Sequence, residues 1–215
     1  MSVILGINAY HPGASSALIV DGTPVYAVAE ERFNRIKHYA GFPHLSIEAC
    51  LKFANISWED IDVVSVGRDP RVNRLQKFFY LLQHPHGGSN FAQIVKRRHF
   101  LNDIRRLISV KCSANPKHLR FKVEHVEHHL AHTASAYFIS PWERAGAITI
   151  DGSGDFVTCM MSQCEGSEIR IKHKIFVPHS LGALYTAICQ FIGYDSYGDE
   201  GKVMGLAPMG KDTYE

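Results

Sequence analysis

Hydrophobic and polar positions follow a repeating order along the chain. Apolar runs at 3–7, 14–20 and 25–29 are separated by turn residues, including an Asp-Gly pair that is a strong hairpin signal. They predict a meander of three strands. The apolar spacing over 43–55 predicts a helix directly after it.

The same order begins again after residue 142. Runs at 145–150, 156–163 and 169–176 predict three more strands, 180–192 predicts a helix, and a glycine-rich loop follows at 193–202. This repetition indicates two related α/β lobes. We place the first at 1–142 and the start of the second, incomplete lobe at 143–215.

The middle of the chain has a different pattern. Residues 61–67 and 119–125 predict two strands, and a helix is expected to open in the histidine stretch after the second strand and to run to about Ser140. Between the strands, an insertion at about 68–118 has apolar residues at helical spacing. It predicts two helices, at about 71–83 and 90–109, joined by a polar loop.

Charge is distributed unevenly. The whole chain has a net charge of +2, yet residues 68–120 contain 12 Lys or Arg and only two acids. Such a basic region is able to bind a nucleotide, a nucleic acid or an acidic protein. We favour the solvated face of a helical insertion, because the basic residues recur every three to four positions between apolar ones.

Composition excludes several classes of protein. With 46% hydrophobic and 20% charged residues, the chain is ordinary for a globular protein. It has no apolar run of about 18 residues and no signal peptide, so we expect a cytoplasmic protein that does not enter a membrane. Its five scattered cysteines lack a C-x-x-C pair, which argues against a disulfide framework and a zinc ribbon.

Three histidines occupy five positions of one short stretch. If this stretch is helical, His128 and His132 lie one turn apart on the same face and are able to offer nitrogens to one metal ion. His125 and His129 have the same spacing, but we expect His125 to belong to the preceding strand. Two ligands do not complete a site, so a third ligand has to come from a distant part of the chain. The alternative is a pair of surface or hydrogen-bonded histidines.

Small residues in the first turn of each lobe are candidates for binding a nucleotide. Backbone N–H groups in turns that contain glycine and serine approach phosphate oxygens closely. One turn contains Ser15, the other contains the run Asp151, Gly152, Ser153 and Gly154, and Gly201 in the later loop is a further candidate. As isolated patterns these turns are also compatible with plain hairpins.

Two other polar positions are candidates for contacting a substrate. His11, in the first turn, is a candidate contact for substrate or phosphate, and equally a hydrogen-bonded turn residue. Lys37 follows the third strand together with Arg32 and Arg35. Their positive charges would balance an anionic substrate, although a solvated loop would have the same composition.

Five segments, taken together, resemble the N-terminal part of the carbamoyltransferases of the NodU/CmcH type. In chain order they are ILGINAYHPGASSALIVDG, AEERFNRIKH, EHHLAHTASAYF, ITIDGSGDF and GDEGKVMGLAPMG. The resemblance covers essentially all 215 residues. It implies an α/β fold of the ribonuclease-H-type, actin-like (ASKHA) class, similar to the metal-bearing subunit of tRNA threonylcarbamoyl transferases. The first lobe would be complete and the second lobe truncated.

The resemblance also implies an activity. In this family a C-terminal YrdC-like domain makes carbamoyl-adenylate from carbamoyl phosphate and ATP. The actin-like domain then moves the carbamoyl group to a hydroxyl of a small molecule, such as an antibiotic, another natural product or a sugar. The chain would therefore be the N-terminal portion of an O-carbamoyltransferase, with antibiotic biosynthesis among its settings.

Several residues match the family's functional positions. His128 and His132 match metal ligands, with Fe(II) or another divalent metal as the expected ion. His11 and Lys37 match positions that contact the adenylate or the carbamoyl group, and 151–154 match the nucleotide turn of the second lobe.

The resemblance also implies parts that this sequence does not contain. The carboxylate expected as third metal ligand, the rest of the second lobe and the YrdC-like domain would lie beyond Glu215. We expect the chain alone to be incomplete as an enzyme, and exposed apolar surface on the partial lobe to favour a homodimer or a partner.

Two other functions stay open at this point. An actin-like kinase or phosphohydrolase would use the same nucleotide cleft with magnesium, but it would leave the histidines unexplained. A non-catalytic module would dock a nucleic acid or an acidic protein on residues 68–120.

Overall fold

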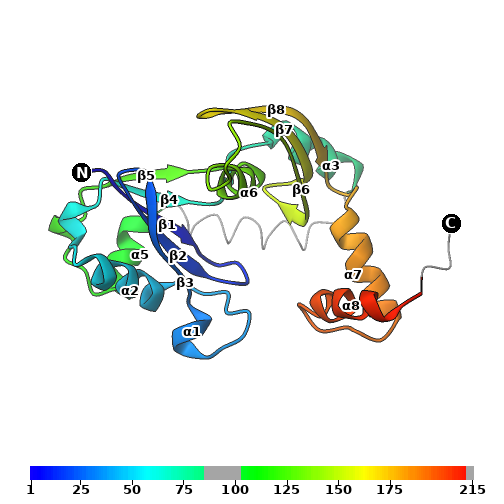
Figure 1. Cartoon of the computed structure of the whole chain (residues 1–215), viewed down its shortest axis with the longest axis horizontal. Helices are drawn as coiled ribbons and strands as arrows, with labels where there is room; N and C mark the ends of the chain where they lie inside the picture. The colour runs from blue at the N-terminus through cyan, green and yellow to red at the C-terminus, as the bar shows by residue number, and fades with distance from the viewer. Residues whose placement is uncertain (85–102, 212–215) are drawn as a thin grey trace. The chain divides into compact units, whose positions relative to one another are not determined.

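The chain forms two compact units, Met1–Ala131 and His132–Glu215. A computed structural model describes residues 1–84 and 103–211 (Figure 1). The boundary between the units falls inside a helix, whereas the sequence pattern placed the boundary between lobes at 142/143. Each unit combines a sheet with helices.

The first unit is built on a five-stranded mixed sheet with the order β3-β2-β1-β4-β5 (Figure 1). The strands are β1 (Val3–Asn8), β2 (Ser15–Val20), β3 (Thr23–Ala29), β4 (Val63–Val66) and β5 (Lys122–His125). β1, β2 and β3 form the predicted antiparallel meander, and β4 and β5 extend it in parallel with β1. A mixed sheet combined with helices agrees with the predicted α/β fold class, which is confirmed.

Helices and short turns lie between and after these strands in the sequence. They are α1 (Glu31–Asn34), α2 (His44–Ala54), α3 (Arg74–Gln83), α5 (Ile104–Lys111) and α6 (His128–Tyr137), with short 3-10 turns η1 (Trp58–Asp60) and η3 (Pro116–His118). α2 packs on β2 and β3. The alternating residues of β1 are 0–4% exposed and share the core with buried positions of α2 and α5: Val3, Leu5, Ile7, Ile47, Cys50, Ile104 and Ile108.

Two of these helices lie in the charged segment after β3 and at the end of the insertion. The charged segment after the third strand makes one helical turn, α1, because the N–H groups of Phe33 and Asn34 both donate to the carbonyl of Glu30. The second predicted helix of the insertion, 90–109, lies outside the described residues up to 102. Its remainder is helical as α5.

The second unit repeats the order of the first, as predicted. β6 (Arg144–Gly154), β7 (Val157–Glu165) and β8 (Glu168–Phe176) form an antiparallel meander, and α7 (Leu181–Phe191), α8 (Glu200–Leu206) and the 3-10 turn η4 (Ala207–Met209) follow it.

Two details of the second unit differ from the sequence-based expectation. Residues 151–154 were predicted as a turn but continue β6, and the hairpin turns at Asp155 and Phe156, whose φ angles are 49° and 79°. A register shift between Ile150 and Gly154 accommodates the additional length of the strand. In addition, α8 begins at Glu200, inside the predicted glycine-rich loop.

Helix α7 exposes an apolar stripe. Five side chains at helical spacing are 38–62% exposed: Leu181, Leu184, Tyr185, Ile188 and Ile192. By contrast, Ile47 and Cys50 of α2, the helix that follows the first meander, are fully buried. As for membranes, none of the helices in the described ranges combines the length and the apolar character needed for a span.

Candidate functional site

Helix α6 carries the histidine stretch. It begins at His128, and His132 follows one turn later; β5 ends at His125, as predicted. His129 is fully buried, whereas His128 is partly buried and the side chain of His132 is 53% exposed. Of the three histidines in this helix, His128 and His132 are therefore the two that a ligand from solution is able to reach.

Glu127 stabilises the beginning of α6. Its side-chain Oε2 accepts a hydrogen bond from the N–H of Leu130 at 2.9 Å, and its carbonyl accepts one from Ala131 at 2.9 Å. This is the geometry of a helix N-cap. The residue is only 7% exposed, so the first turn of α6 contains a buried carboxylate.

Within the second unit, Asp151 faces His132. The distance between His132 Nε2 and Asp151 Oδ2 is 3.7 Å, and the Asp151 side chain is 35% exposed. Its other oxygen, Oδ1, accepts the N–H of Gly152 at 2.6 Å. An imidazole nitrogen and a carboxylate oxygen placed in this way are donor atoms that divalent metals accept.

Sequence reasoning assigned Asp151 to a nucleotide turn and expected the carboxylate ligand beyond Glu215. It did not consider Asp151 as a ligand, because the pairing with His132 depends on the tertiary structure. The available signal was local: Asp151 is an acid that directly follows the apolar run 145–150.

The backbone around Asp151 is held by the start of α7. Ser180 is the N-cap of this helix: its Oγ accepts the N–H of Ala183 and lies 3.1 Å and 2.8 Å from the carbonyl oxygens of Asp151 and Gly152. Gly182 packs so closely that an added Cβ would lie 2.6 Å from the carbonyl carbon of Asp151. Sequence reasoning did not single out Ser180 or Gly182.

The charged side chains of Asp151 and Glu200 affect the loop that follows α7. Desolvation, and then the charges of Asp151 and Glu200, raise the pKa of Tyr197. The pKa of Glu200 is lowered mainly by the hydrogen bond from Thr186, at 2.6 Å. Gly201 lies in the first turn of α8 with open space around it.

In the first unit, the structure brings His11 next to His128. The two ring centroids are 5.9 Å apart, and His11 Nδ1 lies 3.1 Å from the carbonyl oxygen of Pro12. The turn itself depends on positive φ at Tyr10 and Gly13. Ser15 is the first residue of β2.

The other predicted positions are on the surface or in a strand. Lys37 lies in an exposed turn after α1, next to His38, whose N–H donates to Glu31. Gly152 and Ser153 are exposed near the end of β6, whereas Gly154 is buried.

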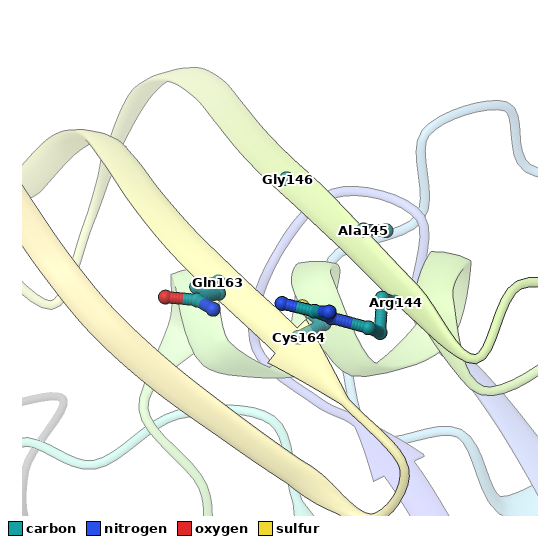
Figure 2. Close-up of a pocket in the computed structure, with 5 residues that line it drawn as sticks. All are labelled: Arg144, Ala145, Gly146, Gln163 and Cys164. Atoms are coloured by element: carbon teal, nitrogen blue, oxygen red, sulfur yellow. The ribbon is translucent and has the colours of Figure 1, made fainter.

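A surface depression of about 300 Å³ lies elsewhere on the second unit, as Figure 2 shows. Arg144, Ala145, Gly146, Gln163 and Cys164 line it. Arg144 is seven residues from Asp151, or about 23 Å along an extended strand. Its guanidinium is 3.4 Å from Glu165, and burial raises the pKa of the Cys164 thiol. This depression is therefore separate from the His132–Asp151 pair.

Comparison with known proteins shows the family of the chain. A family model described as "Carbamoyltransferase N-terminus" matches residues 3–214. The chain is 35% identical to the uncharacterized protein sll1178 of Synechocystis, over 100% of this chain and 36% of that protein. It is 33% identical to nodulation protein NolNO of Sinorhizobium fredii, over 93% and 28% of the two chains. The uncharacterized protein MJ1051 of Methanocaldococcus jannaschii is 30% identical, over 95% and 33%. The chain thus spans about a third of the length of these relatives.

Two solved structures show a weaker likeness. YeaZ from Pseudomonas aeruginosa is 18% identical with a TM-score of 0.45, over 85% of this chain and 73% of that chain. An uncharacterized protein from the same organism, with similarity to peptidase YEAZ, is 19% identical with a TM-score of 0.43, over 83% and 67%. With TM-scores this low, neither structure supports a conclusion about the site.

Proposed function

Because the chain belongs to the carbamoyltransferase N-terminus family, we propose that it is the N-terminal portion of an O-carbamoyltransferase. The proposed donor is carbamoyl-adenylate, made from carbamoyl phosphate and ATP. The proposed acceptor is a hydroxyl of a small molecule such as a natural product or a sugar.

One observation carries the proposal: His132 and Asp151 face each other at 3.7 Å, and His128 lies one turn before His132 on the same helix. We propose that these three residues are the protein ligands of a metal ion. Two ligands of one ion with bonds of about 2.1 Å are roughly 3 Å apart, so only a small side-chain adjustment is needed.

The donor set agrees with Fe(II) or another divalent transition metal. Two histidines and one carboxylate that leave further positions open are typical of non-haem Fe(II) sites, and imidazole also suits zinc. An ion bound there would supply Lewis-acid polarisation of the carbamoyl carbonyl.

His11 is the proposed proton acceptor. The carbonyl of Pro12 accepts hydrogen bonds only, so the imidazole proton belongs on Nδ1 and the lone pair on Nε2. Placed beside His128, His11 is suited to receive the proton of the acceptor hydroxyl as the hydroxyl oxygen attacks the carbamoyl carbon. The bond between that carbon and the phosphate oxygen of the adenylate would break, and AMP would leave with the bonding electrons. The exposed ammonium of Lys37 would pair with the phosphate of the adenylate.

Backbone groups would hold the rest of the nucleotide. The exposed Ser153 offers its N–H group near Asp151, between Gly152, whose own N–H donates to Asp151 Oδ1, and Gly154. Ser15 and Gly201 are the proposed contacts from the two other segments. Serine hydroxyls and glycine backbone are suited to phosphate oxygens.

Metal analysis of the purified protein tests the ligand set. We expect one divalent ion in the parent protein and background levels in His128→Ala, His132→Ala and Asp151→Ala. His173→Ala, which removes an exposed histidine of β8, is the matched control and should retain the ion. Equal metal content in the parent and in the three ligand variants would contradict the site.

The activity is tested separately. The intact protein should transfer a carbamoyl group from carbamoyl phosphate, with ATP, to a hydroxyl acceptor, as detected by mass spectrometry. The three ligand variants should lose at least about a hundredfold in rate. Undiminished carbamoyl transfer by these variants would show that the reaction does not need the metal site.

A further inference from the structure

Ser180 uses its hydroxyl group in two ways. Its Oγ accepts the N–H of Ala183 at 3.0 Å, which is the hydrogen bond of a helix N-cap. The same oxygen lies 3.1 Å from the carbonyl oxygen of Asp151 and 2.8 Å from that of Gly152. Carbonyl oxygens only accept hydrogen bonds, so the hydroxyl proton is shared by these two groups. Capping requires only a lone pair of the hydroxyl, and the donation to β6 is therefore a second, separate role.

The end of β6 depends on such contacts for its position. β6 pairs Ile150 with Cys159 and Gly154 with Val157, and the register shifts between these two pairs. The regular ladder with β7 is thus interrupted over residues 151–153. Gly182 of α7 packs against the same backbone, with an added Cβ only 2.6 Å from the nitrogen of Gly152. The start of α7 therefore contacts β6 where the ladder holds it least.

A single peptide group connects Ser180 to the carboxylate of Asp151. The carbonyl of Asp151 and the N–H of Gly152 belong to the same planar unit. Ser180 donates to the carbonyl end of this unit, and the N–H end donates to Asp151 Oδ1 at 2.6 Å. Holding the plane at one end therefore holds the carboxylate at the other. The second oxygen, Oδ2, faces His132 Nε2 at 3.7 Å.

We propose that Ser180 is a positioning residue that orients the Asp151 carboxylate for a divalent ion. The inference rests on the proposed metal site, in which Asp151 is a ligand, and adds a residue that is not a ligand. The Ser180 hydroxyl holds the peptide plane after Asp151, and this plane holds the carboxylate in the direction of His132. Groups that orient the ligands of a metal contribute to its affinity, although they do not touch the ion.

Three substitutions separate the donated proton from the cap. Ser180→Gly removes the hydroxyl but keeps a good N-cap, because glycine is tolerated almost as well as serine at this position. Ser180→Thr keeps the hydroxyl. Ser180→Ala removes it with less backbone freedom and serves if the glycine variant folds poorly.

Ser57→Gly is the matched control. Ser57 is the N-cap of η1 in the first unit. Its Oγ also accepts a backbone N–H, from Glu59 at 3.3 Å, and also donates its proton, to Asp60 at 2.8 Å. The substitution therefore removes the same kind of capping serine from a helical turn of the other unit.

Titration of the metal-free full chain with Co²⁺, followed by its visible absorption, tests the proposal. We expect about tenfold weaker Co²⁺ binding in Ser180→Gly, and binding close to that of the parent in Ser180→Thr and Ser57→Gly. At saturating Co²⁺ the visible bands of Ser180→Gly should differ from those of the parent, because an oxygen ligand is displaced. The thermal unfolding midpoint of metal-free Ser180→Gly should stay close to that of the parent, because the cap is retained.

The outcomes distinguish this inference from the proposed function. Co²⁺ affinity of Ser180→Gly equal to that of the parent would overturn the role of Ser180 and leave the metal site intact. Equal weakening in Ser180→Gly and Ser180→Thr would show that the hydroxyl does not orient Asp151. Equal weakening in Ser180→Gly and Ser57→Gly would assign the effect to a general loss of stability, and either result also overturns the inference. No Co²⁺ binding by the parent would overturn the metal site itself, and the role of Ser180 with it.

Discussion

Glu30 is a charged residue without exposed surface, and its carboxylate connects the end of the meander to the next helix. Oε1 accepts the N–H of Leu45 at 3.0 Å, and Oε2 accepts that of Ser46 at 2.7 Å. His44 Nδ1 lies 3.3 Å from Oε1. One side chain thereby satisfies the free N–H groups at the start of α2, which otherwise has no side-chain cap.

Removing this carboxylate should be costly for folding. In Glu30→Ala, two N–H groups at the buried end of α2 lose their acceptor, so the free energy of unfolding should fall by about 3 kcal/mol. Urea unfolding measures the change. Glu48→Ala, on the exposed face of α2, should change it by less than about 0.5 kcal/mol. A similar small loss in both variants would show that Glu30 does not hold this helix.

At the scale of elements, the contact between α7 and β6 depends on Gly182. An alanine Cβ there would meet the backbone of Asp151 and Gly152 at 2.6 Å, a distance at which one element has to move. The moving part would include the carboxylate that faces His132. Packing of a helix and the geometry of the candidate site are thus linked through one glycine.

Gly182→Ala should therefore lower the free energy of unfolding by about 1–3 kcal/mol, as overpacking does. The same substitution should weaken metal binding. Gly205→Ala is the matched control, because Gly205 lies in helix α8 with open space around it, and alanine should stabilise that helix by up to about 1 kcal/mol. Chemical denaturation measures both variants. A Gly182→Ala protein as stable as the parent would contradict the close contact.

A second contact between elements joins α7 to α8 through Thr186 and Glu200, and its strength should depend on pH. The hydrogen bond from Thr186 lowers the pKa of Glu200 below its ordinary value of 4.5. A carboxyl with a lowered folded-state pKa stabilises the fold above its unfolded pKa, and this stabilisation is lost as the pH falls through the lowered value.

Thr186→Val removes the donor and should lower the free energy of unfolding by about 1 kcal/mol at neutral pH. The difference from the parent should shrink below about pH 4.5 and disappear in more acidic solution. Unfolding curves recorded from pH 7 to pH 3 measure it. Thr23→Val, at the exposed start of β3, should show no such pH dependence. A constant difference across this range would rule out the charge of Glu200 as its cause.

Most elements were predictable because their signals are local. Apolar runs between turn residues identified the strands of both meanders, and the histidine stretch marked the start of α6. The turn at Asp155 and Phe156 was not predictable, since the glycines at 152 and 154 gave a stronger turn signal and a phenylalanine with positive φ runs against turn preferences. His132 and Asp151 lie 19 residues apart in the sequence, and tertiary contacts bring their side chains together. Patterns in a single sequence do not show such contacts.

At the scale of the whole molecule, the two meanders are followed by helices in different surroundings. α2 buries Ile47 and Cys50 completely, whereas α7 leaves Leu184 and Ile188 exposed by 55% and 50%. Contiguous exposed apolar side chains usually mark an interaction surface or promote association. The stripe on α7 is therefore suited to contact another surface.

Charged substitutions on this stripe should be tolerated by the fold. Leu184→Lys and Ile188→Lys together should change the free energy of unfolding by less than about 1 kcal/mol, because both side chains are half exposed. They should also reduce binding of an apolar fluorescent dye. Ile47→Lys in α2 is the contrasting variant and should unfold the chain. Strong destabilisation by the α7 pair would show that this stripe is covered in solution.

The buried thiols have a practical consequence for labelling. Burial is the main cause of a raised pKa at Cys50, Cys164 and Cys189, and it raises that of Cys112 to about 12. The fifth thiol, Cys159, is 8% exposed. Because the thiolate is the reactive form, all five should react slowly with maleimides at neutral pH. A cysteine introduced at the exposed Ser153 would then accept a fluorophore selectively, two residues from Asp151, and would report ligand binding without removal of the native cysteines.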